Sequence, residues 1–213
     1  ILTITKNWKK AIKFFKIANE IDPLNENVIN NIAYIYTEIK EYDRSLDIIR
    51  KGLKINKNNF FLLNLQGKIF VNNLLIDQGV KSYLECIKIK KDFWNAYENL
   101  FFILESTNQL TLLKKYIDRA KEIFHNNKLL IIIEANYFFR KKEYIICDNL
   151  LNTSDLKKHL INNVHYLILY YDLLARSSEK LSKYVNVFKF IEKRNLIKKN
   201  LKENKNFDKN IIL

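Results

Sequence analysis

Few residues in this chain have types and spacings that could carry out catalysis or bind a metal. The histidines are His125, His159 and His165. The last two stand six residues apart in an expected helix, so they do not share a face as a metal-binding pair at i and i+4 would. The three glycines are isolated, so there is no glycine-rich phosphate loop, and no serine stands in a nucleophile-elbow context. We therefore expect no catalytic residue, no metal and no cofactor within this chain.

The net charge of +14 would suit nucleic acid or a membrane surface as a partner. Arginine, which is preferred for bidentate phosphate contacts, supplies only six of the 37 basic residues. Lysine, asparagine and isoleucine are abundant together, as an AT-rich genome would favour. We interpret the charge as composition bias on solvated faces and do not expect nucleic acid as a partner. Binding of RNA through a basic surface is the alternative.

The two cysteines predict small buried side chains rather than a disulfide framework. Cys86 and Cys147 are far apart in the sequence, and each stands on the apolar face of an expected helix. This usage favours a reducing compartment, and we expect a cytoplasmic protein. The longest apolar runs, such as residues 129–133, are far too short to cross a bilayer, so no membrane span is expected.

The feature that organises the chain is a repeat whose blocks begin at Glu26, Phe60, Trp94 and Lys128. When these blocks are aligned, a mostly small residue recurs early in each block, and an aromatic or aliphatic residue follows three positions later. A second small position recurs near the end of each block. A period of about 34 residues with paired amphipathic runs is the signature of stacked helical hairpins. The recurring residues are Ala33, Gly67, Phe101 and Ala135, then Tyr36, Phe70, Leu104 and Phe138, then Gly52, Cys86, Ala120 and Ser154.

The sequence predicts an all-α chain with one helical array over residues 1–200 and a loose basic tail over 201–213. Glycine and proline are very scarce, which favours helices throughout. A first helix over residues 6–21 ends before Pro23 and belongs to a partial unit, 1–25. Four repeats follow at 26–59, 60–93, 94–127 and 128–156, with first helices at 26–39, 60–73, 94–107 and 128–140 and second helices at 42–55, 76–89, 110–123 and 144–152.

The end of the array is expected to be irregular. A polar cluster at residues 152–155 predicts a turn, and a terminal helix pair follows over 157–200. Its helices are predicted at 157–176 and 179–200, with the break at Ser177-Ser178. The last helix is expected to turn Tyr184, Phe188 and Ile191 inward and to present Lys183, Lys189, Lys193 and Lys198 to water.

The blocks resemble the tetratricopeptide repeat, from residue 1 to about residue 200. The best match is Trp8, Ala11, Phe15, Ala18 and Pro23, where small residues let two backbones approach and aromatic residues fill the remaining gap. The resemblance implies a tetratricopeptide-type helix-hairpin superhelix, an α-solenoid. It also implies a protein-interaction scaffold whose concave face, lined by the first helices, binds an extended peptide or partner segment.

The candidate binding residues are the polar positions expected on that face. Asparagine amides both donate to and accept from a peptide backbone, which allows binding that tolerates sequence variation. Asn31 and Asn99 occupy equivalent positions two repeats apart. The candidates are Asn27, Asn31, Tyr34, Asn64, Lys68, Asn95, Asn99, Asn136 and Arg140.

A second, narrower resemblance gives an alternative function. The spacing Tyr184-x3-Phe188-x6-Asn195, followed by two lysines, is similar to the junction segment of bacterial proteins that join a tetratricopeptide array to a sulfotransferase domain. This would make the chain the non-catalytic N-terminal region of a sulfotransferase, whose sulfated adenosine nucleotide would bind downstream. Methionine is absent, so we expect the chain to be a fragment.

Overall fold

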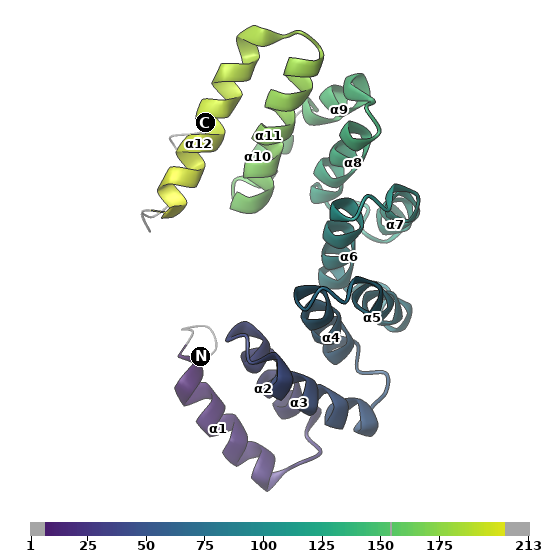
Figure 1. Cartoon of the computed structure of the whole chain (residues 1–213), viewed down its shortest axis with the longest axis vertical. Coiled ribbons are helices and arrows are strands. Elements are labelled where there is room, and N and C mark those ends of the chain that lie inside the picture. Colours follow the sequence, from purple (N-terminus) through teal and green to yellow (C-terminus); the bar gives the residue numbers. More distant parts are fainter. Residues whose placement is uncertain (1–6, 154, 203–213) are drawn as a thin grey trace. The chain divides into compact units, whose positions relative to one another are not determined.

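The computed structural model describes residues 7–153 and 155–202. Within these residues the chain forms twelve α-helices and no strand, which confirms the predicted all-α hairpin array (Figure 1). Two compact units divide it, unit 1 over residues 1–108 and unit 2 over residues 109–213. Unit 1 contains α1 (Trp8–Ile21), α2 (Glu26–Glu38), α3 (Tyr42–Ile55), α4 (Phe60–Asn72), α5 (Ile76–Ile89) and α6 (Trp94–Ser106). Unit 2 contains α7 (Leu110–Ile123), α8 (Leu129–Arg140), α9 (Tyr144–Leu151), α10 (Leu156–Leu160), α11 (Val164–Lys180) and α12 (Tyr184–Lys202).

The turns that close the hairpins repeat as regularly as the helices do. Lys40, Leu74, Asn108 and Lys142 stand one period apart, and each has a positive φ of 57–64°. This left-handed conformation ends one helix and redirects the chain into the next. Only asparagine among these residue types adopts it readily, so at the other positions the turn is imposed by the packing of the helices on either side.

Small residues bring the helices of unit 1 into close contact. Ala33 is fully buried, and a Cβ added to Gly67 would lie 2.6 Å from a ring atom of Tyr83. A Cβ added to Gly52 would lie 2.4 Å from Leu62, in the following repeat. In unit 1, α2 contacts both α3 and α4, and α4 contacts both α5 and α6. The first helices α2, α4 and α6 are therefore consecutive neighbours (Figure 1).

Unit 2 departs from the period after α9. The predicted helix over 157–176 is wrong, because the chain forms the short α10 and then a longer α11. Asn163 begins α11 by accepting a hydrogen bond from the Tyr166 backbone N–H at 3.4 Å. The predicted break at Ser177-Ser178 is also wrong, since both serines are buried inside α11. The Ser177 hydroxyl donates to the Leu174 carbonyl at 3.3 Å, so the helix tolerates it.

The last helix presents a different face from the one predicted. α12 begins at Tyr184 rather than at 179, and Tyr184 and Phe188 are 62% and 76% exposed. Phe190 and Ile197 pack into the core of unit 2 instead. Lys193, expected in water, lies 5.8 Å from the Tyr171 ring centre. The helix is oriented by ion pairs as well as by apolar contacts, Lys183 to Asp148 at 2.7 Å and Arg194 to Asp172 at 2.5 Å. Of the predicted tail, 201 and 202 belong to α12, and 203–213 lie outside the described residues.

Candidate partner-binding face

One side of the first helices in unit 1 turns away from the second helices. Residues at i, i+3, i+4 and i+7 share a side of a helix, and the buried positions Ala33, Gly67 and Phe101 mark the side that packs inward. The opposite side carries mostly polar residues. We call this surface the first-helix face; it comprises Asn27, Asn30, Asn31, Tyr34 and Glu38 of α2, Asn64 and Lys68 of α4, and Asn95, Glu98, Asn99, Phe102 and Ser106 of α6.

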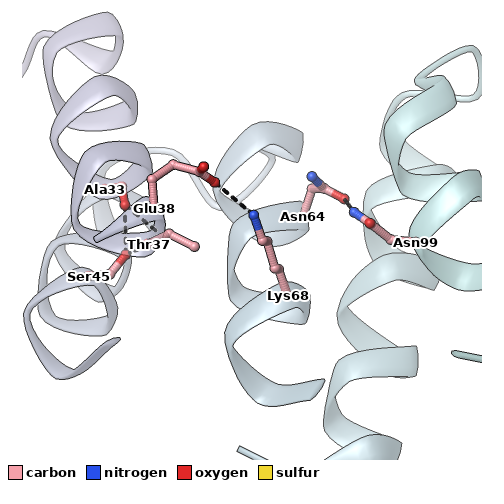
Figure 2. A network of polar contacts seen from close by, with 7 residues as sticks. All are labelled: Ala33, Thr37, Glu38, Ser45, Asn64, Lys68 and Asn99. Carbon is pink, nitrogen blue, oxygen red and sulfur yellow. Dashed lines mark hydrogen bonds and ion pairs between the residues drawn. The ribbon is translucent and has the colours of Figure 1, made fainter. Parts of the chain in front are cut away.

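An ion pair crosses this face from α2 to α4. Lys68 Nζ lies 2.7 Å from Glu38 Oε1, and both side chains remain partly exposed (Figure 2). Tyr34 lies beside the pair, and its pKa is raised, mainly by burial and further by the negative charge of Glu38. Tyr34 also packs edge-on against Trp8, with ring centres 6.2 Å apart. The predicted candidates Tyr34 and Lys68 therefore both lie beside the carboxylate of Glu38, which was not among the candidates.

An amide pair continues the face from α4 to α6. Asn99 Nδ2 donates to Asn64 Oδ1 at 3.0 Å (Figure 2). Asn64 is buried, whereas Asn99 is half-buried and keeps its own carbonyl oxygen outside this bond. The structure thus brings these two candidates into direct contact, and their amides link neighbouring repeats.

The remaining candidates of unit 1 are less connected. Asn31 donates from Nδ2 to the Asn27 carbonyl at 2.6 Å, within its own helix. Asn31 and Asn99 occupy equivalent positions in the sequence, yet the Asn31 amide bonds within its own helix whereas the Asn99 amide bonds the preceding first helix. Asn27 and Asn95 are exposed near the helix starts. In unit 2, the candidates Asn136 and Arg140 both lie on α8, one half-buried and the other exposed.

A buried hydroxyl cluster holds α2 against α3 below the face. The hydroxyls of Thr37 and Ser45 lie 2.9 Å apart, and each lies within 2.9 Å of the Ala33 carbonyl oxygen (Figure 2). All three residues are buried. Because Thr37 precedes Glu38, this cluster fixes the end of α2 from which the carboxylate reaches Lys68.

A second polar cluster ties the start of α2 to the start of α4. Asn56 donates to both Glu26 carboxylate oxygens at 3.0 Å. Asn59 donates to Glu26 at 3.1 Å and to Asn30 Oδ1 at 3.0 Å, while its own oxygen caps α4 by accepting from the Leu62 N–H. The sequence signal for this cluster is the asparagine that recurs one period apart, at Asn25 and Asn59, before two first helices.

Phe102 is the face residue that the sequence analysis missed most plainly. It follows Lys68 by one period, as Lys68 follows Tyr34, and so occupies the same position in the next repeat. Its side chain is 69% exposed, while the preceding Phe101 is buried. The residue one period after Lys68 is Phe102, so the repeat alignment could have placed it on this face. Two adjacent aromatic residues in an apolar helix are, however, usually assigned to the core.

The two cysteines are buried and unreactive thiols. Burial raises the pKa of the Cys86 and Cys147 thiols to about 12, so both are protonated at neutral pH. Cys86 donates to the Phe60 carbonyl at 3.1 Å. Over residues 7–153 and 155–202, no group of three histidine, cysteine or acidic side chains is placed to hold a metal ion. In the same part of the chain, no helix combines the length and apolar character needed to cross a membrane.

Comparison with known proteins identifies the repeat. A family model described as Tetratricopeptide repeat matches residues 27–59. The peroxisomal targeting signal receptor of Candida glabrata is 23% identical over 92 residues, which are 43% of this chain and 16% of the receptor. The matching receptor of Kluyveromyces lactis is 22% identical over 88 residues, 41% of this chain and again 16% of the receptor. The chain therefore covers about a sixth of the length of these curated relatives.

Solved structures show the same fold at low sequence identity. A tetratricopeptide repeat protein from Parabacteroides merdae superposes with a TM-score of 0.72 and 13% identity, covering 90% of this chain and 74% of that one. YrrB, described as a TPR protein with an unusual peptide-binding site, gives a TM-score of 0.63 at 12% identity, over 86% of this chain and 91% of that one. None of these four relatives is described as a sulfotransferase, and the resemblance around residues 184–199 stays a prediction.

Proposed function

We propose that this chain is an interaction scaffold that binds an extended segment of a partner protein along the first-helix face of unit 1. Its repeat at residues 27–59 and its fold are those of a tetratricopeptide-repeat protein. The observation that carries the proposal is the pair of polar bridges, Glu38 to Lys68 and Asn64 to Asn99, which joins α2, α4 and α6 into one continuous polar row. YrrB, of the same fold, is described as having a peptide-binding site.

The row suits an extended backbone because of its spacing. Packed neighbouring helices lie about 8–10 Å apart, and an extended peptide advances about 3.3 Å per residue. Each first helix would therefore meet roughly every third peptide residue. Amides such as that of Asn99 can donate to a peptide carbonyl or accept from a peptide N–H, so the row can hold a backbone of varied sequence. Because Asn64 holds the Asn99 amide, little side-chain entropy remains to be lost on binding.

Selection of peptides tests the proposal. A random library of 12-residue peptides displayed on phage is selected on the immobilised chain, and enriched peptides are synthesised for measurement of Kd. Wild type is compared with an Asn64→Ala/Asn99→Ala variant, for which we expect Kd to rise at least fivefold. The matched control, Asn149→Ala/Asn186→Ala, removes two exposed amides of unit 2 and should leave Kd within twofold.

Circular dichroism of each variant verifies that the helices are intact. The proposal is overturned if the library yields no enriched peptide. It is equally overturned if enriched peptides bind the Asn64→Ala/Asn99→Ala variant as tightly as the wild type.

A further inference from the structure

One position of the repeat runs along the middle of the first-helix face. Tyr34 of α2, Lys68 of α4 and Phe102 of α6 follow one another at intervals of one period, so each occupies the same place on its helix. All three side chains are at least partly exposed, whereas the residue directly before each of them is buried. Because consecutive first helices are neighbours, these side chains form a row that crosses α2, α4 and α6.

This row carries aromatic rings at both of its ends. The Tyr34 ring packs edge-on against Trp8 and lies 6.5 Å from the centre of the Phe61 ring. The three rings are each partly exposed, and together they form an aromatic platform at the α2 end of the row. At the α6 end, the Phe102 ring is 69% exposed. Aromatic side chains are enriched where proteins bind one another, so both ends of the row suit apolar contacts with a partner.

The middle of the row offers no net charge. Lys68 is paired with Glu38, and the neighbouring bridge from Asn64 to Asn99 consists of neutral amides (Figure 2). A charge of the partner placed here would meet an amine and a carboxylate only 2.7 Å apart, whose effects on it largely cancel. The middle therefore favours a peptide backbone with uncharged side chains.

The distance between the two ends of the row sets a spacing in the partner. Tyr34 and Phe102 are separated by two steps from one first helix to the next, roughly 16–20 Å for packed helices. An extended chain advances about 3.3 Å per residue, so this distance corresponds to about five or six residues. In unit 2 the same repeat position holds Asn136, an amide rather than a ring, so aromatic rings occur at this position only in unit 1.

We propose that the bound segment carries two apolar residues about five or six positions apart, one packed on Tyr34 and its neighbouring rings and the other on Phe102. The residues between them are uncharged and lie over the Glu38–Lys68 pair. This inference rests on the proposed function and specifies what the bound segment contains. Amide contacts to a backbone tolerate many sequences, so the two apolar contacts supply the selectivity that the amides lack.

The peptide selection described above also tests this spacing. We expect aligned enriched peptides to share two apolar residues about five or six positions apart, with few charged residues between them. Phe102→Ala should raise the Kd of an enriched peptide at least fivefold, because its ring is removed from the contact. Ile145→Ala, which removes another exposed apolar side chain, is the matched control and should leave Kd within twofold. Tyr34→Phe keeps the ring and should also leave Kd within twofold.

Changes in the peptide measure the spacing directly. Two glycines inserted between the apolar residues of an enriched peptide should raise Kd at least fivefold, whereas the same two glycines added at one end of the peptide should not change it. A double-mutant cycle then assigns the contacts. Alanine at one of the two apolar peptide residues should lose its effect on Kd when the protein carries Phe102→Ala, and alanine at the other should keep its effect.

The outcomes separate this inference from the proposed function. Enriched peptides without the apolar pair overturn the inference, and so do peptides that tolerate the inserted glycines or bind the Phe102→Ala variant as tightly as the wild type. If such peptides still lose affinity with Asn64→Ala/Asn99→Ala, the proposed function stands without it. Because Phe102 is exposed, its replacement should leave the thermal unfolding midpoint unchanged, so lost binding would not reflect lost folding.

Discussion

The two units connect their helices with different polar chemistry. In unit 1, neutral groups supply many of the links: the Asn64–Asn99 amides, the Asn59–Asn30 amides and the Thr37–Ser45 hydroxyls. In unit 2, the links are ion pairs. Lys121 pairs with Glu134 and Lys183 with Asp148, whose carboxylates are largely covered, and Arg194 pairs with Asp172, whose carboxylate is partly exposed.

This difference bears on which unit can bind a partner. A carboxylate neutralised by an internal lysine or arginine has little attraction left for an outside charge, and unit 2 uses Asp148, Asp172 and Glu134 in this way. An amide pair retains unused donors and acceptors after it forms. Unit 1 therefore keeps polar capacity on its first-helix face, whereas unit 2 uses charged groups to hold its helices together, both the periodic pair α7 and α8 and the aperiodic pair α11 and α12.

The largest effect on stability is expected from overpacking a close helix crossing, and each unit contains such a crossing. Ala33→Leu in unit 1 should lower the free energy of unfolding by about 1–3 kcal/mol, because the site is fully buried and the added atoms overpack it. Ala135→Leu should do the same in unit 2. Urea unfolding followed by circular dichroism measures both. Ile145→Leu, at an exposed position, is the control, and a fully retained stability of Ala33→Leu would contradict the inferred crossing.

Alkaline pH should destabilise both units through their buried thiols. Burial holds the pKa of Cys86 and Cys147 at about 12 in the folded chain, against about 8.5 when unfolded. The unfolded thiols lose protons first, so stability is constant below about pH 8.5 and falls as pH rises from there to 12. Each thiol should cost about 1.4 kcal/mol per pH unit in this window.

Cys86→Ala and Cys147→Ala test this assignment by comparing the slope of unfolding free energy against pH from 8.5 to 10. Each replacement should reduce the slope by the contribution of one thiol, about 1.4 kcal/mol per pH unit. The buried Tyr83, whose pKa is also raised, adds to the slope only nearer its own unfolded pKa of about 10. An unchanged slope in both variants would mean that the thiols ionise equally in the folded and unfolded chain.

Much of the fold follows from the repeat period alone. The period placed the helices from α2 to α9 to within one residue, because each hairpin repeats the same packing problem. It failed after residue 151, where the period ends. Ser177-Ser178 looked like a break because serine is a weak helix former, yet both side chains are buried within α11.

The candidate face was partly predictable, and the limit is again physical. The candidates of unit 1 lie on the side of the first helices that faces away from the second helices, although one of them, Asn64, is buried there. The bridges could not be predicted, because the Glu38–Lys68 and Asn64–Asn99 pairs are separated by 30 and 35 residues rather than by one period. Their formation depends on how the helices cross and how far each side chain reaches. In α12, lysines occur on several sides, so charge pattern alone did not select the buried face.

Removing the lysine from an ion pair of unit 2 should have a moderate effect. Lys121→Met leaves Glu134, whose side chain is only 9% exposed, without its partner at 2.6 Å. A covered carboxylate that loses its cation costs about 1 kcal/mol after allowance for the exposed lysine. Chemical denaturation measures the loss. A second variant, Lys121→Met/Glu134→Gln, should recover part of it, since the uncompensated charge is then gone.

The matching change in unit 1, Lys68→Met, should have the smallest effect on the free energy of unfolding. Its contrast with Lys121→Met is the sharpest test of the difference between the two units. Lys68→Met removes the partner of Glu38, but both side chains of that pair are partly exposed, so water replaces the lost contact. Exposed ion pairs contribute about 0–1 kcal/mol, and we expect a loss below that of Lys121→Met. Both variants are measured by denaturation in low and high salt. If Lys68→Met lowers the free energy of unfolding more than Lys121→Met does, the Glu38–Lys68 ion pair is a structural support of α2 and α4. The polar row of unit 1 would then stabilise the fold in the same way as the ion pairs of unit 2.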